Sequence, residues 1–160
     1  MQELRAPVLA RASAMIAGPE PTFATALLLH LDPVGRRVGY SNAGHPPAIL
    51  RGPDGTIRLL DANQHPMFGL ALRPHELVYE PMAEGAVVLA YTDGLVERRG
   101  ESIDEGIDRL AALVGPLEVD DPDVALADLV GRVGGMDLDR RATTDDVAAV
   151  LVRADPRSSS

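Results

Sequence analysis

Three aspartates stand next to the two most apolar stretches of this chain. Asp93 follows the run VVLAYT at 87–92, and Asp145 and Asp146 precede the run VAAVLV at 147–152. If these runs pair antiparallel in one sheet, the end of the first and the start of the second share an edge where the carboxylates meet. Carboxylates gathered there repel one another unless a cation, a shared proton or water lies between them. The pattern indicates a metal site, while on spacing alone the acids can also simply cap a turn and begin a strand.

These carboxylates are suited to binding a hard divalent cation. Mg²⁺ and Mn²⁺ prefer oxygen ligands, keep several waters and commonly bind one or two carboxylates, a need that Asp93 and Asp145 fit. The chain has no cysteine, which excludes disulfides, thiolate metal sites and cysteine nucleophiles and disfavours zinc. We interpret His45, which two prolines follow, as a turn histidine rather than a ligand or a base.

The charge of the chain is acidic and unevenly spread. The formal net charge is −9, and the stretch 93–146 alone holds fifteen acidic and six basic residues. An acidic surface repels phosphate backbones, so we expect no nucleic-acid partner. No apolar run approaches the roughly 20 residues that span a bilayer, and the first residues do not build a signal peptide. We therefore expect a cytoplasmic protein without membrane association.

The element that carries Asp93 is predicted to be a buried strand. The run at 87–91 lacks the polar alternation of a half-exposed strand, which favours a strand covered on both faces. Asp93 and Gly94 then predict an immediate turn, because glycine accepts backbone angles that are closed to other residues. The run at 147–152 has the same apolar character and predicts the partner strand.

The remaining pattern predicts one α+β layered domain over 1–153, followed by a disordered tail at 154–160. Strands come first and helices are segregated from them, and Ser102 with Glu105 forms a capping box at the start of one helix. We expect an amphipathic helix at 4–16, a hairpin of strands at 22–31 and 38–42, short strands at 48–51, 56–60 and 77–80, an irregular loop at 61–74, and helices at 102–114 and 121–135.

Three motifs in order resemble those of a known enzyme family. The stretches YTDGLVE at 91–97, NAGHPP at 42–47 and TDDV at 144–147 resemble the metal-dependent protein phosphatases of the PPM type, in the bacterial SpoIIE/RsbU branch. The likeness runs from about residue 4 to residue 153. It implies an antiparallel β-sandwich flanked by helices, with two Mn²⁺ or Mg²⁺ ions at one end of the sandwich.

The resemblance also implies a reaction and a set of site residues. In that family, a metal-activated water attacks the phosphorus of a phosphoserine or phosphothreonine. By motif position, Asp93 and Asp145 correspond to ligands of the second metal, and Gly94 and Asp146 to supporting residues around them. The motif at 42–47, with its members Asn42, Gly44 and His45, corresponds to a structural turn near the site.

One family motif is missing from the sequence. The family carries a glycine-aspartate segment upstream of the first helix, whose Asp bridges both metals, and nothing like it occurs here. The resemblance therefore implies an N-terminally truncated sandwich with an unpaired edge, and a single weakly held ion in place of two. Relatives act on phosphorylated anti-sigma factor antagonists, which makes such a regulatory protein the expected partner. A catalytically inactive PPM-like module that binds that partner is the alternative. A third hypothesis is that the chain covers its open edge by forming a homodimer or by strand exchange.

Overall fold

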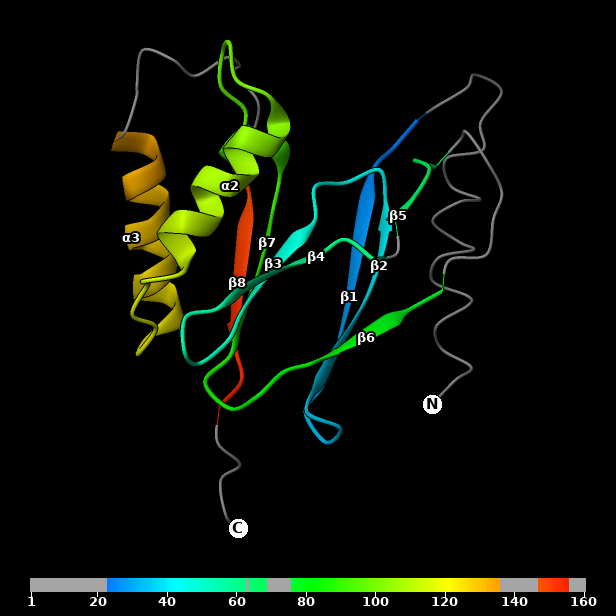
Figure 1. Cartoon of the computed structure of the whole chain (residues 1–160), viewed down its shortest axis with the longest axis vertical. Coiled ribbons are helices and arrows are strands. Elements are labelled where there is room, and N and C mark those ends of the chain that lie inside the picture. Colours follow the sequence, from blue (N-terminus) through cyan, green and yellow to red (C-terminus); the bar gives the residue numbers. More distant parts are fainter. Residues whose placement is uncertain (1–22, 63, 69–75, 136–146, 156–160) are drawn as a thin grey trace.

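The computed structural model describes residues 23–62, 64–68, 76–135 and 147–155, and it arranges them as two sheets with helices packed outside one of them (Figure 1). The first sheet contains β1 (Ala26–Asp32), β2 (Arg37–Ala43), β5 (Gln64–His65) and β6 (Val78–Pro81). The second has the order β4 (Ile57–Leu60), β3 (Ala48–Arg51), β7 (Val87–Tyr91) and β8 (Ala149–Arg153). The helices are η1 (Asp93–Leu95, a 3-10 turn), α2 (Ile103–Val114) and α3 (Pro122–Gly135). The predicted α+β class is confirmed.

In the first sheet, the predicted hairpin is confirmed. β1 and β2 pair antiparallel from Ala26–Ala43 to Asp32–Arg37. Asp32 Oδ1 accepts a hydrogen bond from the Gly35 amide at 2.8 Å and closes the turn between the strands. Asp side chains favour such turns because they can accept from a backbone amide a few residues on.

One part of the predicted loop at 61–74 is wrong. Gln64–His65 forms β5, which pairs parallel to β2 and so departs from the predicted all-antiparallel sandwich. The His65 carbonyl also accepts from the Gly44 amide at 2.9 Å. A strand of two residues is too short to show an alternation of apolar and polar residues in the sequence. Gln64 and His65 form a strand because they pair with β2. The predicted helix at 4–16 lies outside the described residues.

In the second sheet, the predicted pairing of the two apolar runs is confirmed. β7 pairs antiparallel with β8 from Val87–Arg153 to Tyr91–Ala149, and with β3 on its other side. The two runs are not equally covered, however. Within the described residues β8 pairs with β7 alone, and Val150 is 61% exposed. An apolar sequence does not by itself reveal whether a strand has one neighbour or two.

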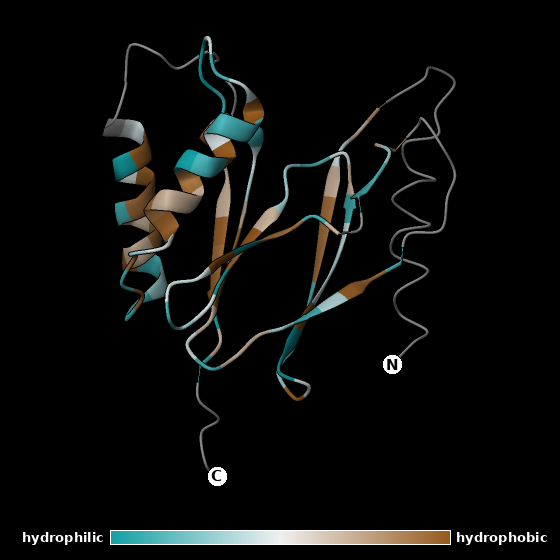
Figure 2. Ribbon diagram, viewed as in Figure 1, coloured by the Kyte–Doolittle hydropathy of each residue, from teal (hydrophilic) through white to brown (hydrophobic). Residues whose placement is uncertain are grey.

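Strand β7 separates two hydrophobic cores. Its side chains alternate, so that Leu89 belongs to the core against the helices and Val88 to the core between the sheets. In Figure 2 the ribbon of β7 is mostly hydrophobic, whereas α2 and α3 alternate between hydrophobic and hydrophilic residues. The helix-side core includes Ile49, Leu110, Val114, Leu129 and Leu151, and the core between the sheets includes Val38, Tyr40, Leu50, Leu60 and Met82.

Both predicted helices at 102–114 and 121–135 are confirmed. Ser102 and Glu105 form the predicted capping box: the Ser102 amide donates to Glu105 Oε2 at 2.8 Å, and Ser102 Oγ accepts from the Glu105 amide at 3.3 Å. Asp121 Oδ1 accepts from the Asp123 amide at 2.9 Å at the start of α3. No helix among the described residues is long and apolar enough to cross a bilayer. After the C-terminal end of β8, the Ala154 carbonyl accepts a hydrogen bond from the Gly85 amide, and the Ala154 amide donates to the Ala86 carbonyl, both at 2.8 Å.

Candidate active site at the ends of two strands

Asp93 stands where β7 leaves the sheet. The Asp93 carbonyl accepts hydrogen bonds from the amides of Val96 and Glu97 at 2.8 and 2.9 Å, which forms the turn η1. Leu95 and Val96 are buried and anchor this turn, whereas the Asp93 side chain is exposed. Its Oδ1 accepts from the Gly94 amide at 2.9 Å, and no donor among the described residues reaches Oδ2. The Asp93 backbone is thus fixed while its carboxylate is open to a ligand.

The turn is confirmed in place, but its predicted cause is wrong. Glycines with positive φ occur elsewhere in the described residues, and Gly94 is not among them. A 3-10 turn has negative φ throughout, so position 94 does not require the freedom that only glycine has.

Thr92 joins the end of β7 to the residue before β8. Its amide donates to the Ala148 carbonyl at 2.9 Å, its Oγ1 accepts from the Ala148 amide at 2.9 Å, and Oγ1 also lies 3.4 Å from the Ala148 carbonyl oxygen. These contacts extend the ladder one residue past the Tyr91–Ala149 pair. Ala148 follows Asp145 by three residues in the sequence. Asp145 and Asp146, the other predicted acids, lie outside the described residues.

The turn between β2 and β3 is built around the Asn42 side chain, which is fully buried. Asn42 Nδ2 donates to the His45 carbonyl at 2.6 Å, and Oδ1 accepts from the His45 amide at 2.8 Å. Gly44 has φ of 68°, and a Cβ there would lie 3.0 Å from the Met67 Cβ, so this position favours glycine. His45 Nδ1 lies 2.9 Å from the Pro46 carbonyl oxygen. The side chain of His45 is thereby engaged within its own turn.

The strand register places this turn at the same end of the molecule as Asp93. Ile49 pairs with Leu89, so the start of β3, the end of β7 and the start of β8 share one end of the second sheet (Figure 1). No three His, Asp or Glu side chains within 23–62, 64–68, 76–135 and 147–155 lie close enough together to hold a metal ion. The exposed Asp93 carboxylate fits a hard cation as one oxygen ligand.

Helix α2 packs directly on the segment that follows Asp93. A Cβ on Gly106 would lie 2.3 Å from the Val96 carbonyl oxygen. Arg109 Nη2 donates to that same oxygen at 2.8 Å, and Arg109 Nη1 bonds to the Glu101 carboxylate. This contact was not predicted from the sequence. Its one sequence signal is a glycine inside an otherwise good helix, which often marks a close approach of another backbone.

Tyr91, next to this turn, carries a buried hydroxyl. The residue is buried in the helix-side core, and its hydroxyl has no hydrogen-bond partner among the described residues. Burial raises the pKa of the Tyr91 hydroxyl far above its ordinary value, so that the group stays neutral.

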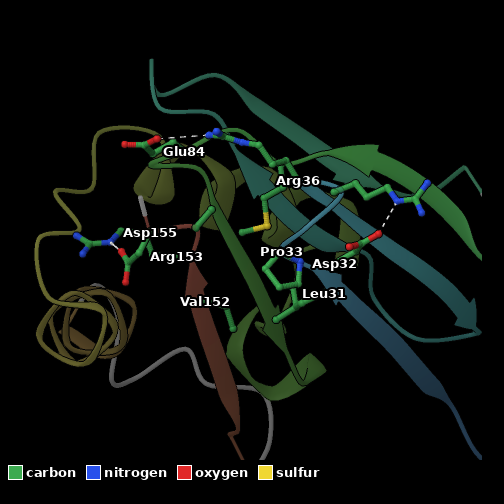
Figure 3. A pocket seen from close by; sticks show the side chains of 11 residues that line it. Leu31, Asp32, Pro33, Arg36, Glu84, Val152, Arg153 and Asp155 are labelled. Atoms are coloured by element: carbon green, nitrogen blue, oxygen red, sulfur yellow. Dashed lines mark hydrogen bonds and ion pairs between the residues drawn. The ribbon is translucent and has the colours of Figure 1, made fainter. Parts of the chain in front are cut away.

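A cleft with a volume of about 410 Å³ lies at the opposite end of the sheets (Figure 3). Its apolar wall includes Leu31, Pro33, Met82 and Val152. Three exposed ion pairs line its rim: Arg36–Glu84, Arg37–Asp32 and Arg153–Asp155. Because the cleft opens at the start of β7 and Asp93 follows its end, the cleft is separate from the candidate site.

Comparison with known families shows the family to which the chain belongs. The sequence model of the family described as stage II sporulation protein E (SpoIIE) matches residues 5–155. The chain belongs to the SpoIIE family. The resemblance to the PPM phosphatases of the SpoIIE/RsbU branch is thereby confirmed.

Individual SpoIIE relatives agree in sequence and in fold. The chain is 32% identical over 114 residues to the phosphoserine phosphatase RsbP of Bacillus subtilis, and this match covers 69% of the chain and 25% of RsbP. The structure of the RsbU and RsbW domains of Rv1364c from Mycobacterium tuberculosis is 23% identical with a TM-score of 0.81, over 96% of this chain and 44% of that one. The SpoIIE phosphatase domain of Bacillus subtilis, in crystals presoaked with Mn, is 16% identical with a TM-score of 0.71, over 100% of this chain and 69% of that one.

The SpoIIE relatives are longer than this chain. The chain spans a quarter of the length of RsbP and less than half of the Rv1364c chain. The structural matches are below 25% identity and establish the fold, a PPM-type arrangement of sheets and helices.

Proposed function

We propose that this chain is part of a metal-dependent protein phosphatase of the SpoIIE/RsbU type, which hydrolyses phosphoserine on a regulatory protein of the anti-sigma factor antagonist class. The observation that carries the proposal is the joining of β7 to β8 by Thr92. That contact brings the beginning of the motif YTDGLVE, with Asp93, beside Ala148, the residue that follows the motif TDDV. The match to RsbP, a phosphoserine phosphatase, supports the choice of substrate chemistry.

In this proposal the acids at the strand ends hold the metal. Asp93 and Asp145 would bind Mn²⁺ or Mg²⁺, Asp146 and Gly94 would support them, and the bound ion would supply an activated water for attack on phosphorus. The buried anchor of η1 fixes the Asp93 backbone, so that its carboxylate is presented without reorganisation. Two hydrogen bonds between the Asn42 side chain and the backbone of His45 fix the turn at 42–47 at this end of the molecule.

The test is phosphate release from a phosphoserine peptide with and without Mn²⁺. Three proteins are compared: the wild-type chain, Asp93→Asn and Glu84→Gln. Asp93→Asn removes a metal-binding charge at constant shape, and we expect the rate to fall by at least about 100-fold. Glu84→Gln is the matched control, because Glu84 is an exposed carboxylate before the start of β7 whose ion pair with Arg36 is 3.5 Å long. It should leave the rate unchanged.

Two outcomes of this experiment would contradict the proposal. Equal rates in the wild-type chain and Asp93→Asn would contradict the role of Asp93. A folded wild-type chain, shown by circular dichroism, that releases no phosphate at any Mn²⁺ concentration would contradict the phosphatase proposal and favour the inactive partner-binding module.

A further inference from the structure

Arg99 carries an exposed guanidinium on the loop between η1 and α2. Nine arginines lie in the described part of the chain, and the other eight each contact a carboxylate or a backbone carbonyl there. Arg99 has no such contact within 23–62, 64–68, 76–135 and 147–155. Because a guanidinium only donates hydrogen bonds, the N–H groups of Arg99 are suited to binding an anion.

The loop is held on both sides of Arg99. On one side, Arg98 Nη2 donates to the Val133 carbonyl at 3.4 Å. On the other side, the Glu101 amide donates to the Arg98 carbonyl at 3.2 Å, and the Glu101 carboxylate pairs with Arg109. The backbone that carries Arg99 is thus fixed, while its side chain is open to solvent.

Arg99 lies within reach of a substrate that binds at Asp93. The Glu97 amide donates to the Asp93 carbonyl at 2.9 Å, so these two residues are one turn apart. Arg99 follows Glu97 by two residues, which span at most about 7 Å. In Figure 1 this loop stands at the end of the molecule where β7 ends. In an extended peptide, residues two to four positions from a phosphoserine lie about 7–13 Å from it, which matches the distance from Asp93 to the loop.

We propose that Arg99 binds an acidic residue that flanks the phosphoserine of the substrate protein. A guanidinium pairs with a carboxylate through two parallel hydrogen bonds, a geometry that lysine cannot copy. Acids outnumber bases by fifteen to six in the stretch 93–146, so Arg99 is a local point of attraction on a surface that otherwise repels an acidic peptide. This inference rests on the proposed function and narrows its substrate class to phosphoserine sequences with an acidic neighbour.

The experiment measures peptide binding by fluorescence anisotropy in the presence of Mn²⁺. Three peptides carry a phosphonate analogue of phosphoserine, which cannot be hydrolysed, and have Glu, Gln or Lys three residues away from it. We expect the wild-type chain to bind the Glu peptide about 5–10-fold more tightly than the Gln peptide, as a bidentate ion pair at an exposed site allows. Arg99→Gln should abolish this preference, and Arg99→Glu should favour the Lys peptide instead.

Arg36→Gln is the matched control for the change in net charge. Arg36 is a half-exposed arginine at the cleft, at the opposite end of the sheets from Asp93. Its substitution removes the same charge, and the preference for the Glu peptide should remain. Loss of the preference in Arg36→Gln as well would show an effect of overall charge and would overturn the role of Arg99.

The other outcomes separate this inference from the proposed function. A wild-type chain that binds neither peptide, or binds the Glu and Gln peptides equally, would overturn the role of Arg99. An equal loss of affinity for both peptides in Arg99→Gln would also overturn it, because the guanidinium would then contact the phosphate group itself. A wild-type chain that prefers the Glu peptide through Arg99, but releases no phosphate from the hydrolysable form, would contradict the phosphatase function alone.

Discussion

Two glycine-to-alanine substitutions in the helices are expected to change stability in opposite directions. Ala is favoured over Gly in a helix by about 1 kcal/mol. A Cβ on Gly131 in α3 would meet no atom of the described residues within 4 Å, so Gly131→Ala should raise the free energy of unfolding by about 0.5–1 kcal/mol. Gly106 in α2 is different, because its Cβ would lie 2.3 Å from the Val96 carbonyl oxygen.

The cost at Gly106 can be worked from that contact. Real Cβ atoms do not approach an oxygen so closely, so α2 or the backbone at Val96 must move by roughly 1 Å. Overpacking of this kind costs about 1–3 kcal/mol, and a carbonyl, unlike a flexible side chain, cannot rotate away, which places the cost near 3. After the propensity gain, Gly106→Ala should lose about 2 kcal/mol.

The assay is urea and thermal unfolding followed by far-UV circular dichroism. For a chain of this size, we expect the Tm of Gly106→Ala to fall by about 4–8 °C and that of Gly131→Ala to rise by about 1–4 °C. A Gly106→Ala protein as stable as Gly131→Ala would refute the packing of α2 on the turn that carries Asp93.

Two further predictions concern the other turn and the helix cap. Asn42→Ala should lower the free energy of unfolding by about 2–4 kcal/mol in urea titrations, because the amide and carbonyl of His45 lose the partners that the buried Asn42 side chain provides. Asp54→Ala, a variant in an exposed turn, is the control. A loss in Asn42→Ala no larger than that in Asp54→Ala would argue against this role of Asn42. Hydrogen bonds from the amide and then the hydroxyl of Ser102 lower the pKa of Glu105 below its ordinary value of 4.5. The stabilisation from Glu105 is therefore present above that value and is lost as the pH falls through the lowered pKa. Glu105→Gln should reduce the loss of stability as the pH falls below 4.5, and an unchanged pH dependence would contradict the cap.

Local signals in the sequence were enough for several of the elements. The hairpin of strands at 22–31 and 38–42, the capping box of Ser102 and the apolar run at 87–91 each carry their cause within a few residues, and the structure has the elements they predict. The antiparallel pairing of the two apolar runs was a condition of the metal-site hypothesis, and the structure has that pairing.

Features that depend on residues far apart in the chain could not be predicted in this way. The hydroxyl of Thr92 bonds to a residue 56 positions away, and nothing in the stretch YTDG reveals that its own carbonyl is already engaged. Gly106 approaches Val96 only because α2 folds back on the turn. The two-residue strand β5 exists only because β2 offers an edge to it. The prediction that Gly94 makes the turn failed because a 3-10 turn needs no special residue there.

The alternation of β7 between two cores has a consequence for cooperativity. The strand that presents Asp93 is held on one face by α2 and α3 and on the other by the first sheet. If either layer detached, one face of β7 would be bared to water, and the strand end would lose its fixed position. The candidate site therefore forms only when the helix layer and the first sheet are both packed on β7. A partly folded form that lacks either layer should not retain the site.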